Sequence, residues 1–351
     1  MPLAQGFSVK DVMSETSVRS KRESRETHVL AAGAIAAIET PLFILASPRS
    51  FTSVVCAMIG QHPQMYGLPE TNLFGFRTVA GWLRVCAKLQ DQMSHGLLRA
   101  VAEVYWGEQT HGTIRLAHAW LRRRSHFTTA FLFETLAGQV GRRSLVDKSP
   151  SIVFRPQFMR RAYAMFPYAR FLHLVRHPRS YGESFSKAIE MQTRHGALPR
   201  WLWCKAADPA PTTEGKTLQT KTRVDPQYFW LKHNRSIGDF LTTVPEGQKL
   251  QIRGEDLMSE PDRVLTRISH WLGVRTDARA IDEMKHPERS PYASLGPPGA
   301  KFGNNRLFLE DPVFRPYCAN VQTLDGPLPW RTDGQGFDTK VCQLARELGY
   351  S

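Results

Sequence analysis

Two short apolar runs, each followed at once by a polar turn and a helical stretch, constrain the fold of this chain most. PLFILAS (41–47) leads through Ser-Pro-Arg-Ser into FTSVVCAMIGQ, and FLHLV (171–175) leads through a proline turn into a second helical stretch. A buried strand, a turn and a helix in this order form the repeating unit of parallel sheets. SLVDKS (144–149) is a third candidate strand, and residues 249–274 have the pattern of a strand, a loop and a helix. We therefore expect an α/β fold in which helices flank a central parallel β-sheet of about five strands.

The remaining segments indicate how the chain is organised around that sheet. Residues 1–28 are polar and lack the periodicity of a core, so we expect a tail or linker there. The segments 78–89 and 98–106 have helical spacing. Residues 192–225 are rich in Pro, Gly, Thr and Lys without a clear period, which indicates a lid or insert. We therefore expect one domain over residues 29–351, with the insert at about 192–225.

Charge and cysteine content narrow the function classes. The chain has 46 Lys and Arg against 32 Asp and Glu, so its formal net charge of +14 attracts polyanions. Zinc-finger spacing, an RNA-recognition signature and a heptad-linked basic region do not accompany this charge, so we expect neither nucleic-acid binding nor a metal site. The five cysteines are scattered and include no CxxC pair, which favours reduced thiols and a cytoplasmic location. The small-residue stretch 31–38 is too short to span a bilayer, so no membrane anchor is expected.

The turn after the first apolar run is a candidate phosphate site. A strand that opens into a helix brings unpaired backbone N–H groups and the positive end of the helix to one point. Arg49 adds a forked cation there, and Ser50, Thr52 and Ser53 add hydroxyl donors. The alternative is a helix that is simply capped by a serine or threonine. The segment lacks the glycines and the lysine of a Walker loop, so a kinase or nucleotide hydrolase is disfavoured.

The turn after the second apolar run carries a similar set. Arg176 ends the predicted strand in HLVRHPRSYGESF, and Ser184 lies eight positions further on, two turns into the predicted helix. Both side chains can reach one phosphate. A basic surface turn is the alternative interpretation.

In these segments the chain resembles the PAPS-dependent sulfotransferase family, closest in appearance to bacterial members of the polyketide-associated or carbohydrate type. PRSFTS resembles the P-R-S-G-S-T-like loop that binds the 5′-phosphosulfate of 3′-phosphoadenosine 5′-phosphosulfate (PAPS), and Arg176 with Ser184 resembles the R-x-P…S element for the 3′-phosphate. VDKSP (146–150), WLKHNRSI and IRGEDLMSEPDRVL are similar to the E-K-[TS]-P, W-x-x-x-N and Y-E-D-L elements. The resemblance covers about residues 41–273 and implies a P-loop-like sulfotransferase fold.

One position of the PRSFTS loop departs from this pattern. Phe51 stands where the loop commonly has glycine, and a side chain there restricts the backbone and can crowd the phosphate cradle. We still expect the N–H groups of residues 50–53 to face the 5′-phosphate, because the start of a helix orients them.

The resemblance also implies roles in catalysis. Glu70, in a loop after the first helix, corresponds to the catalytic carboxylate of one branch of the family and would accept the hydroxyl proton of the acceptor; a solvated loop glutamate is the alternative. His62 is its closest rival as base. Lys148 and Arg49 would balance charge on the sulfuryl oxygens in the transition state, although Lys148 could instead form a structural ion pair. Asp147 is more consistent with a structural or acceptor-orienting role than with a second base.

Other residues are weaker candidates for the donor site. Trp230 and Asn234 lie four residues apart on one helix face, where the tryptophan could stack near adenine or pack in the core. Lys301 and Gly303 lie in a loop that resembles the donor-closing loop of the family. Among further histidines, we expect His173 in the core, His177 in a phosphate-orienting turn and His233 on a helix surface.

The implied activity is transfer of a sulfuryl group from PAPS to a hydroxyl, without a metal, leaving adenosine 3′,5′-bisphosphate. The acceptor stays open between two possibilities. One is a β-hydroxyacyl chain on an acidic acyl carrier protein in secondary metabolism, and the other is a carbohydrate or small metabolite sulfated by a free-standing enzyme. A catalytically silent nucleotide-binding protein is the alternative from a different class.

Overall fold

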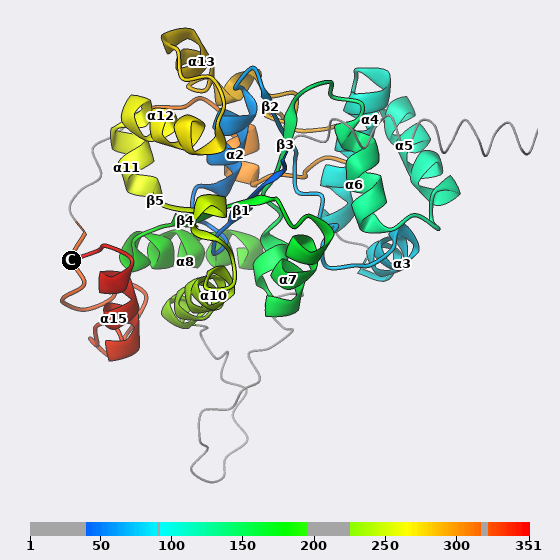
Figure 1. The fold of residues 1–351 in the computed structure, drawn as a ribbon. Coiled ribbons are helices and arrows are strands. Elements are labelled where there is room, and N and C mark those ends of the chain that lie inside the picture. Colours follow the sequence, from blue (N-terminus) through cyan, green and yellow to red (C-terminus); the bar gives the residue numbers. More distant parts are fainter. Residues whose placement is uncertain (1–39, 90–91, 195–224, 317–321) are drawn as a thin grey trace, which may run out of the picture.

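The computed structural model describes residues 40–89, 92–194, 225–316 and 322–351. Its sheet has five strands, all parallel, in the order β2-β3-β1-β4-β5 (Figure 1). The strands are β1 (Leu42–Leu45), β2 (Met65–Gly67), β3 (Ser144–Asp147), β4 (Arg170–Val175) and β5 (Lys249–Arg253). The predicted α/β fold with a parallel sheet of about five strands is confirmed. The predicted tail and residues 195–224 of the predicted insert lie outside the described residues.

Alternating side chains of β1 pack into two separate hydrophobic cores, one on each face of the sheet. Leu42 and Ile44 pack on one face of the sheet, whereas Phe43 and Leu45 pack on the other, as the period of two in a strand requires. The first face is covered by α2 (Thr52–Gly60), α11 (Gly254–Ser259), α12 (Pro261–Leu272) and α13 (Ala278–Glu283) (Figure 1). The second is covered by α3 (Val79–Leu89), α4 (His95–Trp106), α5 (His111–Arg123), α6 (Thr129–Ala137), α7 (Pro156–Met165) and α10 (Pro226–Leu241).

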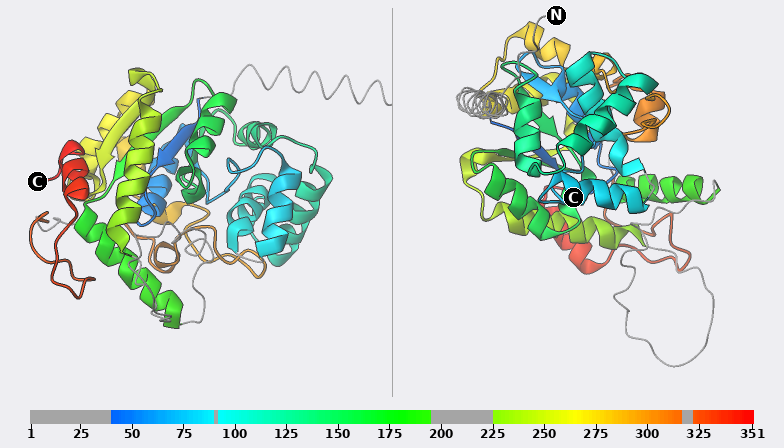
Figure 2. Two further views of the ribbon diagram at one scale, coloured as in Figure 1. Left: turned by 90° about the horizontal axis from the view of Figure 1, so that it is seen from below. Right: turned by 90° about the vertical axis from the view of Figure 1, so that its right-hand side faces the viewer.

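A third apolar cluster joins the helices beside β4. Helix α8 (Pro178–Arg194) runs along α10, and α15 (Thr339–Glu347) packs against α10 near the end of the chain (Figure 2). Helix α14 (Arg306–Glu310) follows the loop around residue 303. None of the helices in the described ranges combines the length and apolar composition that a membrane crossing requires.

The expected helices before β3 and the expected loop after β5 have different outcomes. The helices expected at 78–89 and 98–106 are present as α3 and α4. The expectation of a loop after β5 is wrong in part, because Gly254–Ser259 forms the short helix α11. Acidic Glu255 and Asp256 in the first turn favour a helix there, and Arg253 binds the Asp256 carboxylate through both Nε and Nη2.

The fold brings several loops together at one edge of the sheet. Strands β3, β1 and β4 are neighbours and parallel, so the loops that follow them emerge side by side. Ligands of open α/β sheets bind outside this carboxyl edge, at the point where the strand order reverses.

Candidate functional site

The loop between β1 and α2 has an unusual backbone. Arg49 and Phe51 both adopt left-handed conformations, with φ of 74° and 60°. Phe51 is the N-cap of α2, and its side chain has no atom that can accept a hydrogen bond. The interpretation of a helix capped by serine or threonine is therefore wrong. No side chain caps the start of α2, and uncapped N–H groups in the first turn of a helix can donate hydrogen bonds to an anion.

Two arginines flank this loop. Arg49 donates from Nε to Ser184 Oγ on α8 (3.3 Å), and Arg176, just after β4, donates from Nη1 to the carbonyl oxygen of Arg49 (2.6 Å). Burial lowers the pKa of Arg49, and the nearby charge of Arg176 lowers it further. In the described part of the chain no carboxylate forms an ion pair with Arg49. Two guanidinium groups held together in this way are typical of a site for a multiply charged anion.

Lys148 links the start of α2 to Glu70, the predicted base. It follows β3, is fully buried, and donates from Nζ to Ser53 Oγ at the start of α2 (3.1 Å). Its Nζ also lies 2.5 Å from Oε1 of Glu70, whose side chain is 26% exposed. The partly exposed carboxylate of Glu70 and the fully buried ammonium group of Lys148 thus form an ion pair.

Backbone packing fixes the Glu70 loop. The Glu70 N–H donates to the carbonyl oxygen of Gly303 (2.7 Å), and a Cβ on Gly96 would lie 2.1 Å from the Glu70 carbonyl oxygen. Gly303 has φ of 108°, and a Cβ on it would lie 2.7 Å from Gly96 Cα. Two residues further on, the N–H of Asn305 donates to Ser53 Oγ (3.2 Å). The loops after β1, β2 and β3 and the segment 301–305 therefore meet at Ser53 and Glu70.

Asp147 belongs to the support of this cluster. Its buried carboxylate accepts hydrogen bonds from Thr71 Oγ1 (2.6 Å) and from the backbone N–H and hydroxyl of Ser149 (3.0 Å each). Burial raises the pKa of Asp147. These bonds tie the loop after Glu70 to the end of β3, as a structural partner would.

Two predicted residues do not join the cluster. His62 lies before β2, at the amino edge of the sheet, whereas Glu70 follows β2 at the carboxyl edge. Its Nδ1 accepts from the Gln64 N–H and its Nε2 lies 2.9 Å from the Arg275 carbonyl oxygen, so backbone groups occupy both ring nitrogens. Lys301 is exposed and its Nζ lies over the Phe302 ring.

Trp230 and Asn234 lie behind the site. Trp230 is fully buried in the cluster beside β4, so it packs in the core and offers no face for stacking. Its Nε1–H donates to the Arg176 carbonyl oxygen (2.8 Å), which supports that residue. Asn234 donates from Nδ2 to the Trp230 carbonyl oxygen (2.8 Å), and its Oδ1 lies 3.0 Å from His173 Nε2.

The histidines around β4 are buried. His173 packs in the core as expected, and His177 accepts at Nδ1 from the Arg179 N–H in its turn. The expectation that His233 lies on a helix surface is wrong: it is buried, stacks on Phe154, and its Nδ1 lies 3.1 Å from Ser47 Oγ at the start of the phosphate loop. Burial lowers the pKa of all three to about 4.

Sequence reasoning missed a second layer of support. Glu255 on α11 accepts from the His177 N–H (2.9 Å), from Ser180 Oγ (3.3 Å) and from the Tyr350 hydroxyl (2.9 Å). Ser180 Oγ in turn accepts from Arg176 Nε (3.1 Å). The second residue from the end of the chain is thereby connected to Arg176, and no local motif around Tyr350 signals this.

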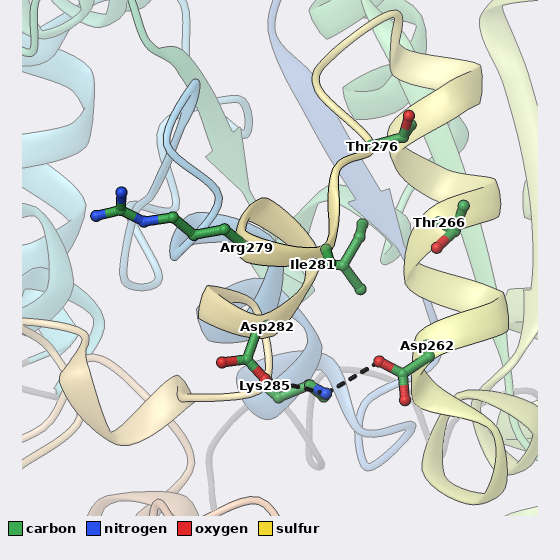
Figure 3. A pocket seen from close by; sticks show the side chains of 8 residues that line it. Asp262, Thr266, Thr276, Arg279, Ile281, Asp282 and Lys285 are labelled. Atoms are coloured by element: carbon green, nitrogen blue, oxygen red, sulfur yellow. Dashed lines mark ion pairs between the residues drawn. The ribbon is translucent and has the colours of Figure 1, made fainter.

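A surface pocket lies elsewhere on the molecule. It has a volume of ≈ 680 Å³ between α12 and the segment with α13, and Lys285 on its wall bonds Asp262 (Figure 3). None of the cluster residues described above lines it. The chemistry-bearing side chains thus gather at the sheet edge and not in this pocket.

The chain is similar in sequence and in fold to sulfotransferases. A model described as the sulfotransferase family matches residues 41–278. A structure of the sulfotransferase domain from the Synechococcus PCC 7002 olefin synthase is similar at a TM-score of 0.66 and 24% identity, covering 89% of this chain and 96% of that one. A sulfotransferase domain from the curacin biosynthetic pathway is similar at a TM-score of 0.62 and 21% identity, covering 89% and 98%. A search of curated proteins gave no match. At these identities the two structures show a shared fold.

Proposed function

Because this chain belongs to the sulfotransferase family, we propose that it transfers a sulfuryl group from PAPS to a hydroxyl acceptor. One observation carries the proposal. The uncapped start of α2 and the pair Arg49 and Arg176 adjoin the Lys148–Glu70 pair through Ser53. This arrangement supports an anion site and a carboxylate base at the same edge of the sheet.

Each group has a distinct part in donor binding. The N–H groups of residues 50–53 bind the 5′-phosphosulfate, and Lys148 lies beside Ser53 with its charge directed there. Arg176 and Ser184 bind the 3′-phosphate, and Arg49, which bonds Ser184, spans the two groups. Asn234 and Trp230 support Arg176 from the core, and Gly303 supports Glu70.

The reaction needs positioning and charge balance more than covalent catalysis. The acceptor oxygen attacks sulfur in line while its proton passes to a carboxylate oxygen of Glu70. The bond between sulfur and the bridging oxygen breaks, and that oxygen keeps the electron pair on the departing adenosine 3′,5′-bisphosphate. Lys148 stabilises the negative charge that grows on the sulfuryl and bridging oxygens.

Binding of two nucleotides tests the donor. We expect adenosine 3′,5′-bisphosphate to bind at least about tenfold more tightly than adenosine 5′-phosphate, because charge-assisted hydrogen bonds to the 3′-phosphate contribute 1.5 kcal/mol or more. Arg176→Ala should remove most of that difference in a calorimetric titration. Equal affinities of the wild-type protein for the two nucleotides would overturn the donor assignment.

For the acceptor, we propose a β-hydroxyacyl chain carried by an acidic acyl carrier protein. Support comes from the +14 charge and from the similarity to sulfotransferase domains of an olefin synthase and of the curacin pathway. Mass spectrometry after incubation with PAPS should show sulfation of the carrier-bound chain in preference to its free thioester analogue. A preference for free carbohydrates or small metabolites would support a free-standing enzyme instead.

A further inference from the structure

The side chain of Phe51 fills a space between two other loops. The Arg176 guanidinium carbon lies 4.3 Å from the centre of the Phe51 ring. On Gly254, at the start of α11, a Cβ would lie 2.3 Å from Phe51 Cδ2. The ring is therefore held between the Arg176 cation and the bare backbone of Gly254.

Two departures from the sulfotransferase motifs complement each other here. Phe51 stands where the phosphate loop commonly has glycine, and Gly254 stands at the first position of the element similar to Y-E-D-L. The chain thus has an aromatic residue on the loop and glycine on the facing element. The contact between them is a property of this particular sequence.

Phe51 occupies a conformation that costs free energy. Its φ of 60° and ψ of 9° lie in the left-handed region, which bulky side chains seldom adopt. Such strain persists where the surrounding structure fixes it, often at functional sites. Its ring provides the compensating contacts with Arg176 and Gly254.

The contact with the Phe51 ring also restricts the orientation of Arg176. A planar guanidinium with an aromatic ring against its face keeps its N–H donors in the plane free to point at other groups. Two such donors already have directions, since Nη1 donates to the Arg49 carbonyl oxygen and Nε to Ser180 Oγ. Together the ring and these bonds determine where the charge of Arg176 lies.

We propose that Phe51 is a positioning residue that sets the preference for a 3′-phosphorylated nucleotide by holding the Arg176 guanidinium against its ring. This inference rests on the proposed PAPS donor. It assigns to the phenylalanine side chain a specificity role that a glycine in this loop cannot perform.

The test compares Phe51→Leu with Phe51→Tyr. Both variants keep a side chain in the left-handed conformation, but only tyrosine keeps an aromatic face. The readout is the ratio of the Kd for adenosine 5′-phosphate to the Kd for adenosine 3′,5′-bisphosphate, measured by calorimetry. We expect Phe51→Leu to lower this ratio by about tenfold and Phe51→Tyr to retain it, as a partly buried cation–π contact predicts.

A second variant perturbs the ring from the other side. In Gly254→Ala the new methyl group must displace the Phe51 ring, so the ratio should fall as well. In the Phe51→Leu background the same substitution should add little, because the aromatic contact is already lost. The proposal is overturned if Phe51→Leu keeps the wild-type ratio or if the two effects add in full. A wild-type ratio near one would instead overturn the donor assignment, so the two failures are distinguishable.

Discussion

At the scale of single residues, Glu70 carries the clearest prediction for catalysis. Glu70→Gln keeps an oxygen for Lys148 Nζ, 2.5 Å away in the wild-type protein, but it removes the group that accepts the proton. We expect kcat to fall by about 10²–10⁴-fold, which is the usual contribution of a general base. The Kd for adenosine 3′,5′-bisphosphate should stay unchanged, since Arg49 and Arg176 are untouched. Steady-state kinetics and calorimetry measure the two quantities.

His62→Gln is the matched control for this prediction. Because His62 lies at the amino edge of the sheet with both ring nitrogens bonded to backbone groups, its substitution should leave kcat unchanged. The opposite pattern, with Gln tolerated at position 70 and not at position 62, would contradict the assignment of the base.

The residues whose place the sequence predicted share one property. Lys148 and Arg176 directly follow β3 and β4, and Arg49 lies in the loop after β1, so their convergence comes from the parallel order of these strands. His62 could not be separated from Glu70 in this way, because β2 between them is only three residues long and has no apolar run. Helical spacing placed Trp230 and Asn234 on one face, but spacing does not tell whether that face turns inward.

At the scale of elements, the start of α4 positions the base. A Cβ on Gly96 would approach the Glu70 carbonyl oxygen to 2.1 Å, so Gly96→Ala must shift either α4 or the Glu70 loop. A displacement of about 1 Å at a reacting group can reduce turnover by up to about 10²-fold. We expect kcat to fall while nucleotide affinity stays unchanged, because the arginines belong to other loops. Gly112→Ala on α5 is the control, as its Cβ would meet Thr110 Oγ1 at an ordinary 3.6 Å. Equal losses in the two variants would contradict the role of α4.

The elements themselves were predictable to the extent that they carry a pattern. The strands β1 and β4 are recognisable as apolar runs, β3 and β5 as shorter strand patterns, and the loop between β1 and α2 from its residues. The segment 301–305 has a weaker pattern, because it reaches the site through the carbonyl group of Gly303 and the N–H of Asn305 and not through side chains. Glu255 and Tyr350 lie 79 and 174 positions after Arg176 in the sequence, and only tertiary packing brings them to its support.

At the scale of the whole molecule, the three histidines around β4 predict acid sensitivity. Burial lowers the pKa of His173, His177 and His233 to about 4, from an ordinary value of 6.5 that applies in the unfolded chain. Between about pH 6.5 and pH 4 the unfolded state therefore binds more protons than the folded state, and the free energy of unfolding decreases as the pH is lowered. Above pH 6.5 the histidines are neutral in both states, and the protein keeps the full stability that acidification removes.

The size of this effect can be measured by urea unfolding at pH 7.5 and 5.5. One pH unit below the unfolded pKa, each buried neutral histidine lowers the free energy of unfolding by roughly 1 kcal/mol, so the wild-type protein should lose roughly 3 to 4 kcal/mol. His173→Gln retains an N–H donor for Asn234 Oδ1 without the titrating ring, and it should lose about one third less on acidification. His126→Gln, at an exposed position, should behave as the wild-type protein does. A wild-type loss that His173→Gln leaves unchanged would show that the acid sensitivity comes from groups other than this buried set.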